Sequence, residues 1–426
     1  MHDLEKGGDK YATASRWKVA LSCVAVVAAA YLAAGLLFDP TPPSTPPSGY
    51  SYVTPPVRFP VQISGCETVE PPRKGGLFGV ILGEKDGYDN PFYPWFSGPK
   101  ATAMTEALRA ALPEDVEIAF ASLQRSLLFE PILGEDPKQE NYGSDTAARA
   151  TLLRGDRAGA LRVSVRLSAQ PVPPCVAGDL DERRTLADGT IIDTHDTWHE
   201  TNRVRTLSRT ATAYLPDGTV VRANATDQVT DRAAAIPLTI EELVTIVTTP
   251  GLRVTAPVPP GTPGPPGRCF TGLKRSPAIA EAQARRWNAV LVGIPLDGLT
   301  LSPPLGALLP AYMGGGVCQI VGLGTPEQDS LLSIKIIIGQ PFPQQDSPDN
   351  AATSRRLADG AVLTTEESRS TASGPTKSTA RRSRTVTVTR PSGTQITVDS
   401  SVTAADEPVS QALLEAIASN PGLDVS

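Results

Sequence analysis

The stretch R-R-T-L-A-D-G at Arg183–Gly189 begins a pattern that occurs twice, since S-R-R-L-A-D-G follows at Ser354–Gly360. Within the pattern, R-T-A-T-A-Y-L-P-D-G-T at Arg209–Thr219 corresponds to R-T-V-T-V-T-R-P-S-G-T at Arg384–Thr394. In each copy a Pro-x-Gly turn separates two strand-like runs. Proline fixes φ and glycine accepts positive φ, so each run pair predicts an antiparallel hairpin.

The repeated segments keep their order to the end of the pattern. T-P-G-L-R-V closes the first copy at Thr249–Val254, and N-P-G-L-D-V closes the second at Asn420–Val425. The offset is 171 residues at both ends (189 to 360, 254 to 425) and 175 between them (219 to 394). A four-residue insertion and a matching deletion account for the difference. We therefore predict a tandem duplication of one folding unit.

The expected fold class is α+β, with an antiparallel sheet and helices on one of its faces in each unit. The first unit is expected at 61–254 and the second at 269–426, joined by a Pro/Gly linker at 255–268. Predicted strands are 78–82, 116–121, 161–167, 203–214, 219–226, 289–294, 332–338, 385–389 and 395–399, and predicted helices are 101–112, 240–247, 277–286 and 410–419. Thr239, with Glu242 three residues later, predicts a capping box at the start of the helix at 240–247.

An apolar segment near the N-terminus predicts a membrane anchor. Val19–Phe38 contains twenty residues, of which only two are outside the apolar set. A helix of that length spans about 30 Å, the thickness of the hydrocarbon layer. Arg16, Trp17 and Lys18 flank it, so residues 1–18 are expected in the cytoplasm and the rest outside the cell membrane, with the lipid bilayer as partner of 19–38. The alternative is a cleaved signal peptide, whose apolar region is usually about 7–15 residues.

Residues 39–60 contain eight prolines. Proline-rich segments adopt extended polyproline II at ~3.1 Å per residue, so we expect a semi-rigid stalk between the membrane and the first unit. The alternative is a proline-rich ligand recognised by a partner protein.

The cysteine count fits an oxidising compartment. Four of the five cysteines lie outside the predicted span, and they divide evenly between the two units. We predict one disulfide in each unit, Cys66–Cys175 and Cys269–Cys318. A zinc site is the alternative, but no C-x₂-C pair is present to form a compact tetrahedral cluster.

Two histidines offer the best candidate for a metal site. His195 and His199 are four residues apart, with acidic residues nearby. On a helix this spacing places both rings on one face, but Asp188-Gly189 and Ile191-Ile192 indicate a strand followed by a loop. The duplicate has no histidine in this region. The site is therefore a weak candidate, and a polar hairpin rim is the preferred interpretation.

No residue is identified as catalytic and no cofactor is expected. The chain contains no G-x-S-x-G, H-E-x-x-H or Walker A motif. A balance of 39 basic and 45 acidic residues also argues against a nucleic-acid partner, which needs a basic face. The basic segment Arg381–Arg384 could contact anionic lipid or wall polymer, but a solvated strand face balanced by acidic loops such as Glu366-Glu367 is preferred.

The elements L-A-D-G-[TA], P-[DS]-G-T and P-G-L, with a short L-T-x-x-[EQ]-L helix, resemble exterior regions of uncharacterised single-span membrane proteins from high-GC Gram-positive bacteria. The resemblance covers Arg183–Val254 and Ser354–Val425, about a third of the chain. It implies an exterior location and no particular activity or site residue.

The sequence thus favours a membrane-anchored, extracytoplasmic binding or assembly protein of the cell envelope over an enzyme. Its partner is expected to be another envelope protein, a wall polymer or a small ligand. The alternative is an extracytoplasmic hydrolase with an acidic active site. Two facing carboxylates in a pocket would favour that alternative.

Overall fold

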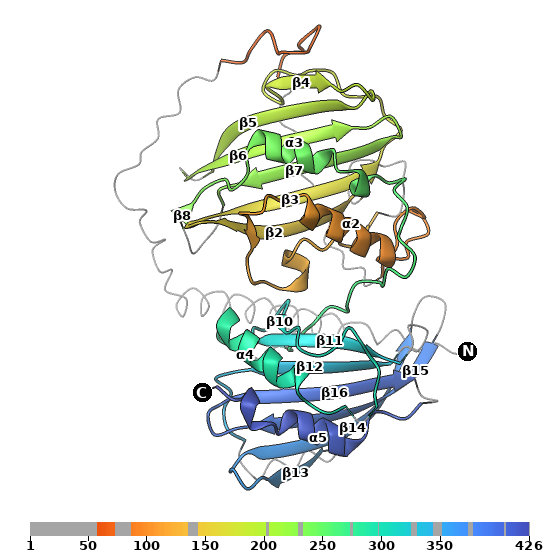
Figure 1. The fold of residues 1–426 in the computed structure, drawn as a ribbon, viewed down its shortest axis with the longest axis vertical. Coiled ribbons are helices and arrows are strands. Elements are labelled where there is room, and N and C mark those ends of the chain that lie inside the picture. Colours follow the sequence, from red (N-terminus) through yellow and green to blue (C-terminus); the bar gives the residue numbers. More distant parts are fainter. Residues whose placement is uncertain are drawn as a thin grey trace, which may run out of the picture. The chain divides into compact units, whose positions relative to one another are not determined.

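The computed structural model describes residues 58–72, 87–134, 144–201, 204–228, 233–272, 276–296, 298–324, 330–343, 352–373, 378–403 and 406–425. These residues form two sheets with a few helices (Figure 1). The predicted α+β class with antiparallel sheets is confirmed. The predicted membrane span at 19–38, its flanking residues, most of the stalk and the predicted strand at 78–82 lie outside the described residues. Within the described part, no helix is long and apolar enough to cross a membrane.

The first sheet follows the strand order β1-β2-β3-β7-β6-β5-β4, with neighbours antiparallel and β8 added in parallel to β3. We call this sheet and its helices the first unit. Its strands are β1 (Glu117–Ile118), β2 (Thr146–Arg154), β3 (Arg157–Leu167), β4 (Glu182–Thr185), β5 (Ile191–Thr201), β6 (Val204–Tyr214), β7 (Thr219–Thr226) and β8 (Ala233–Ala234). Its helices are α2 (Gly98–Ala110) and α3 (Ile240–Val247), with 3₁₀ turns η1 (Leu123–Arg125) and η2 (Pro250–Leu252).

The second sheet follows the order β10-β11-β12-β16-β15-β14-β13, with β9 added to β11. We call this sheet and its helices the second unit. Its strands are β9 (Leu301–Ser302), β10 (Leu309–Pro310), β11 (Val317–Leu323), β12 (Leu331–Ile337), β13 (Ala352–Arg356), β14 (Val362–Ser373), β15 (Ser378–Thr389) and β16 (Gln395–Thr403). Its helices are α4 (Glu281–Val292) and α5 (Gln411–Ala418), with the 3₁₀ turn η3 (Pro421–Leu423).

The two seven-strand paths match strand for strand, from β1 and β10 to β4 and β13. The repeated L-A-D-G turn joins β4 to β5 and β13 to β14, and the Pro-x-Gly turn joins β6 to β7 and β15 to β16. The repeated P-G-L forms η2 after α3 and η3 after α5. In each unit, therefore, the repeated sequence elements occupy the same positions in the sheet.

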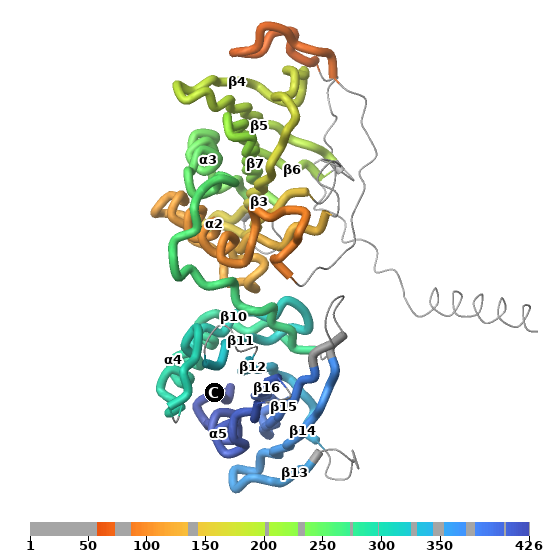
Figure 2. Tube along the Cα trace, turned by 90° about the vertical axis from the view of Figure 1, so that its right-hand side faces the viewer, coloured from red at the N-terminus to blue at the C-terminus, as the bar shows by residue number. Residues whose placement is uncertain are grey.

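Both helices of each unit lie on one face of its sheet (Figures 1 and 2). Alternation along the strands explains why: Leu161, Val163 and Val165 on β3 are buried, whereas Arg162 is exposed and Ser164 is partly exposed. Each sheet thus has one apolar face under its helices and one polar face. The fully buried members of the two cores include Leu161, Ile192, Val221 and Leu243 in the first unit, and Ile334, Val386, Ile396 and Leu414 in the second.

The closing helix of each unit begins at a side-chain cap, which the sequence predicted in the first unit. The backbone N–H of Glu242 donates to the Thr239 hydroxyl at 3.2 Å, and the N–H of Thr239 donates to the Glu242 carboxylate at 2.7 Å. This completes the expected capping box. In the second unit, Ser410 accepts a hydrogen bond from the N–H of Leu413.

Two of the predicted strands differ from the structure. Residues 289–294 were expected to form a strand, but they belong largely to helix α4, which the prediction had ended at 286. Ala284, Trp287 and Leu291 lie on one helical face and are buried in the core, so tertiary packing at helical spacing outweighs the short apolar run. The strand expected at 116–121 is reduced to the two residues of β1.

Candidate ligand pocket

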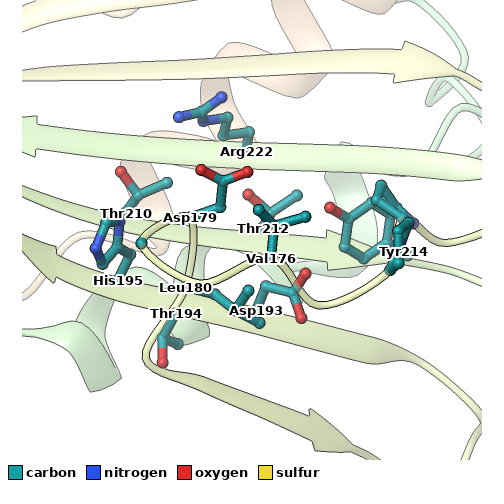
Figure 3. Close-up of a pocket in the computed structure, with 13 residues that line it drawn as sticks. Val176, Asp179, Leu180, Asp193, Thr194, His195, Thr210, Thr212, Tyr214 and Arg222 are labelled. Atoms are coloured by element: carbon teal, nitrogen blue, oxygen red, sulfur yellow. The ribbon is translucent and has the colours of Figure 1, made fainter. Parts of the chain in front are cut away.

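A pocket of about 520 Å³ lies in the first unit, on the sheet face that points away from α2 and α3 (Figure 3). Its floor consists of side chains from β5, β6 and β7, and its wall is the segment Pro173–Leu180. A volume of this size falls in the range of small-molecule sites, about 300–1,000 Å³. The floor residues that bear on its chemistry are Asp193, His195, Thr210, Thr212, Tyr214 and Arg222.

Strand alternation places these side chains together. Ala211 and Ala213 on β6 are fully buried in the core, so Thr210, Thr212 and Tyr214 project from the opposite face. The same reasoning applies to β7, where Val221 and Ala223 are in the core and Arg222 lines the pocket. The pocket floor is therefore formed by the polar face of β5, β6 and β7.

The wall of the pocket is held by a disulfide and by backbone pairing with the segment 63–70. Cys66 and Cys175 are bonded, with their Cα atoms 6.2 Å apart. The backbone N–H of Glu70 donates to the carbonyl of Cys175 at 2.8 Å, and the N–H of Ala177 donates to the carbonyl of Glu70 at 2.9 Å. Ile63, Cys175 and Leu180 form a small separate apolar cluster. These contacts hold the segment 173–180 in place over the sheet.

A row of four residues crosses the pocket floor from strand to strand. In register, Arg183 on β4 is opposite Asp193 on β5, Asp193 is opposite Thr212 on β6, and Thr212 is opposite Arg222 on β7. The first two form an ion pair in which Arg183 Nε and Nη2 donate to the two carboxylate oxygens at 2.6 and 2.7 Å. This pair raises the pKa of the Arg183 guanidinium, mainly through its hydrogen bond to Asp193. The Asp193 charge is thus neutralised inside the row.

Several polar groups in the pocket have no partner within the described residues. These are the guanidinium of Arg222, the carboxylate of Asp179 on the wall, and the hydroxyls of Thr212 and Tyr214. Figure 3 shows all four groups around the same space. Arg222 and Asp179 are both solvent-exposed. The pocket therefore offers a positive group, a negative group and hydroxyls to a ligand.

The electrostatic surroundings of Tyr214 show how charge is distributed at its end of the pocket. Burial raises the pKa of the Tyr214 phenol above its ordinary value, and the Asp193 carboxylate raises it further. Three guanidinium groups act in the opposite direction, those of Arg183, Arg222 and Arg166. The hydroxyl of Tyr214 therefore stays protonated at neutral pH and can donate a hydrogen bond.

The two candidate metal ligands both lie on β5, which runs without interruption from Ile191 to Thr201. The expectation of a loop at 195–200 was wrong, because pairing with β6 extends to Thr201. His195 lines the pocket, with its Nε2 atom 4.0 Å from Asp181 Oδ1, whereas His199 is exposed farther along the strand. Residues four apart on a strand are separated by about 13 Å. Among the described residues, no group of three or more His, Cys, Asp or Glu side chains is arranged to hold a metal.

The second unit replaces the charges of this row with hydroxyls. The positions in register there are Ser354, Thr364, Thr387 and Thr397. The hydroxyls of Ser354 and Thr364 are 3.1 Å apart, and those of Thr387 and Thr397 are 3.3 Å apart. Of the two equivalent rows, the row in the first unit therefore contains the Arg183–Asp193 pair and the Arg222 guanidinium, and the row in the second unit contains no charged residue.

The second disulfide, Cys269–Cys318, joins the end of the linker to β11, next to the edge strand β10. Both bridges in the structure are the pairs expected from the sequence.

The basic segment on β15 is matched by acidic neighbours, as the preferred interpretation requires. Arg384 pairs with Glu367, which lies directly opposite it on β14, and Arg382 pairs with Glu407. Glu366 and Glu367 themselves are strand residues, not loop residues as expected.

Sequence reasoning missed the pocket residues Asp179, Thr212, Tyr214 and Arg222. The alternation of β6 and β7 indicates which side chains share the polar face. It does not indicate that the segment 173–180 covers them, since that contact depends on the disulfide to Cys66.

Comparison of the chain with protein-family models, with curated proteins and with solved structures gives no match.

Proposed function

We propose that this chain is a membrane-anchored extracytoplasmic protein of the cell envelope, in which two units derived from one ancestral fold stand on a proline-rich stalk. In this proposal the first unit binds a small polar molecule in the pocket between β5–β7 and the segment 173–180. The pocket is the observation that carries the binding function, because it combines a suitable volume with unpartnered polar groups.

The exterior location is supported by the two disulfides, which persist in oxidising compartments. The apolar segment 19–38 and its basic flank supply the anchor in this proposal. The matching strand orders support descent from a duplicated unit, since the same turns recur at the same places in both sheets.

The two carboxylates in the pocket favour a binding function over the alternative of a hydrolase, because one of them is already paired with an arginine. Asp179 and Asp193 both line the pocket, as a two-carboxylate mechanism would require. However, both oxygens of Asp193 accept hydrogen bonds from Arg183, so that carboxylate is occupied as a structural partner. Asp179 alone, exposed to solvent, does not form an acid–base pair.

Native mass spectrometry of the full-length protein, extracted from its own membrane in detergent, tests the binding function. We expect a small molecule to co-purify with the wild type and to be lost from Thr212→Trp, whose side chain fills the pocket floor. Thr387→Trp, at the equivalent position in the second unit, is the matched control and should retain the molecule. Absence of any bound mass, or its retention by Thr212→Trp, would rule out the proposed site.

Protease protection tests the location. In intact spheroplasts, a tag placed after Ser426 is expected to be accessible to added protease, whereas a tag before Met1 is expected to be protected. The reverse pattern would contradict the proposed topology.

A further inference from the structure

Arg222 distinguishes the pocket from the otherwise similar polar face of the second unit. Its counterpart in register there is Thr397. Arg183, the other arginine of the row, is already bound to Asp193 with only 14% of its side chain exposed. Arg222 is therefore the cation in the row that is available to a ligand.

Two hydroxyl groups near Arg222, those of Thr212 and Tyr214, can donate hydrogen bonds to the same ligand group as Arg222. Thr212 lies directly across from it on β6, and Tyr214 is two residues further along the same strand face. Neighbouring strands are about 4.8 Å apart and residues two apart on a strand are about 6.8 Å apart. A carboxylate or phosphate placed over β6 can thus accept hydrogen bonds from the guanidinium and from both hydroxyls.

The wall supplies a different kind of group. Asp179 offers an unpartnered carboxylate from the segment that faces the floor. A carboxylate accepts hydrogen bonds and repels a second anion, so the part of the ligand near Asp179 must carry a hydroxyl or an amine. The pocket as a whole therefore suits a molecule that carries an anionic group together with a hydrogen-bond donor.

Resting on the proposed binding function, we infer that the ligand is a small polar molecule with a carboxylate or phosphate group, which Arg222 binds together with the hydroxyls of Thr212 and Tyr214. A planar guanidinium with a free fork of N–H donors is the side chain best suited to either anion. Both anions fit the same chemistry, so the experiment has to separate them.

Isothermal titration of the full-length protein in detergent can use three probes that share one six-carbon skeleton: glucose, gluconate and glucose 6-phosphate. We expect gluconate or glucose 6-phosphate to bind at least about tenfold more tightly than glucose, the effect of one charge-assisted hydrogen bond. Which of the two binds better identifies the anion.

Variants of two arginines on the same sheet make the test specific. Arg222→Thr, which introduces the residue found at the equivalent position of the second unit, should reduce the affinity for the anionic probe about tenfold or more and leave glucose unchanged. Arg222→Lys should restore part of the affinity, because it keeps the charge without the fork. Arg157→Thr, an exposed position on β3 outside the pocket, should have no effect.

Equal binding of all three probes, absence of binding of both anions, or an anion affinity unaffected by Arg222→Thr would overturn the inference. Binding of glucose alone would leave the pocket as a binding site and reject its anionic ligand. Loss of the co-purifying molecule from both tryptophan variants, by contrast, bears on the proposed function and not on the role of Arg222.

Discussion

Arg183 on β4 and Asp193 on β5 form an ion pair through two hydrogen bonds of 2.6 and 2.7 Å, with 14% and 13% of their side chains exposed. Removing one partner leaves the other charge largely buried. We therefore expect Arg183→Ala to destabilise the first unit by about 3 kcal/mol, at the low end for a buried pair because some solvent remains.

The second unit provides the control for this pair. The double variant Arg183→Ser with Asp193→Thr reproduces the Ser354–Thr364 arrangement and leaves no buried charge. It should regain most of the stability lost in the single variant. Urea unfolding of the full chain measures the midpoints. A double variant that is less stable than Arg183→Ala would show that the pair contributes more than charge compensation.

The disulfide Cys66–Cys175 should determine both stability and the pocket. It joins residues 109 apart, and on the chain-entropy model its removal costs about 4 to 5 kcal/mol. Replacing both cysteines by serine also frees the segment 173–180, so the co-purifying ligand should be lost at temperatures where the sheet remains folded. Thermal unfolding monitored by circular dichroism, together with native mass spectrometry, measures both effects.

The matched control is Cys269→Ser with Cys318→Ser, which removes a bridge between residues 49 apart. This variant should lose a similar stability, about 4 kcal/mol, and keep the ligand. Loss of ligand from the control as well would mean that the bridge acts on the whole chain and not on the pocket wall.

Glu242 should give the first unit an acid-sensitive stability. Burial alone would raise its pKa, but hydrogen bonds from Arg154 and from the N–H of Thr239 bring the pKa below its ordinary value of 4.5. Near pH 4.5 the carboxyl group of Glu242 therefore binds more protons in the unfolded chain than in the folded chain. The carboxylate stabilises the fold fully above 4.5, and this contribution disappears as the pH falls through the lower pKa of the folded state.

Glu242→Gln should accordingly lower stability by about 1–2 kcal/mol at neutral pH and have a smaller effect in acid. Urea midpoints at pH about 7 and about 3 measure the difference. Glu281→Gln, which breaks an exposed i,i+4 pair with Arg285, is the control and should change the midpoint little at either pH. An equal effect of Glu242→Gln at both pH values would contradict the expectation.

The glycines of the two P-G-L turns should differ in their tolerance to alanine. A Cβ atom on Gly251 would lie 2.5 Å from the Cβ of Ala107 on α2, whereas on Gly422 it would lie 2.8 Å from a terminal methyl of Val290 on α4. A valine methyl can move by rotation of the side chain, but the Cβ of Ala107 moves only with its backbone. Gly251→Ala should therefore cost about 2–3 kcal/mol in urea unfolding and Gly422→Ala about 1 kcal/mol. The opposite order would show that α2 adjusts more readily than α4.

Much of the fold followed from local chemistry. Period-two alternation and Pro-x-Gly turns predicted the β6–β7 and β15–β16 hairpins, and the Thr239–Glu242 spacing predicted the start of α3. The cysteine count and positions predicted both disulfide pairs. Residues 289–294 were misassigned because a short apolar run fits a strand or a helix equally well, and only contact of Trp287 with the core decided for the helix.

The sequence by itself determined that two copies of one pattern exist, where their turns and caps lie, and which face of each strand is polar, because these depend on neighbouring residues. Only the tertiary structure decided which polar face becomes a pocket. That depended on pairing β7 with both β3 and β6 and on fastening the segment 173–180 to Cys66, contacts between residues distant in sequence. Periodicity specifies the direction of a side chain, whereas the partners it meets are set by the packing of the whole chain.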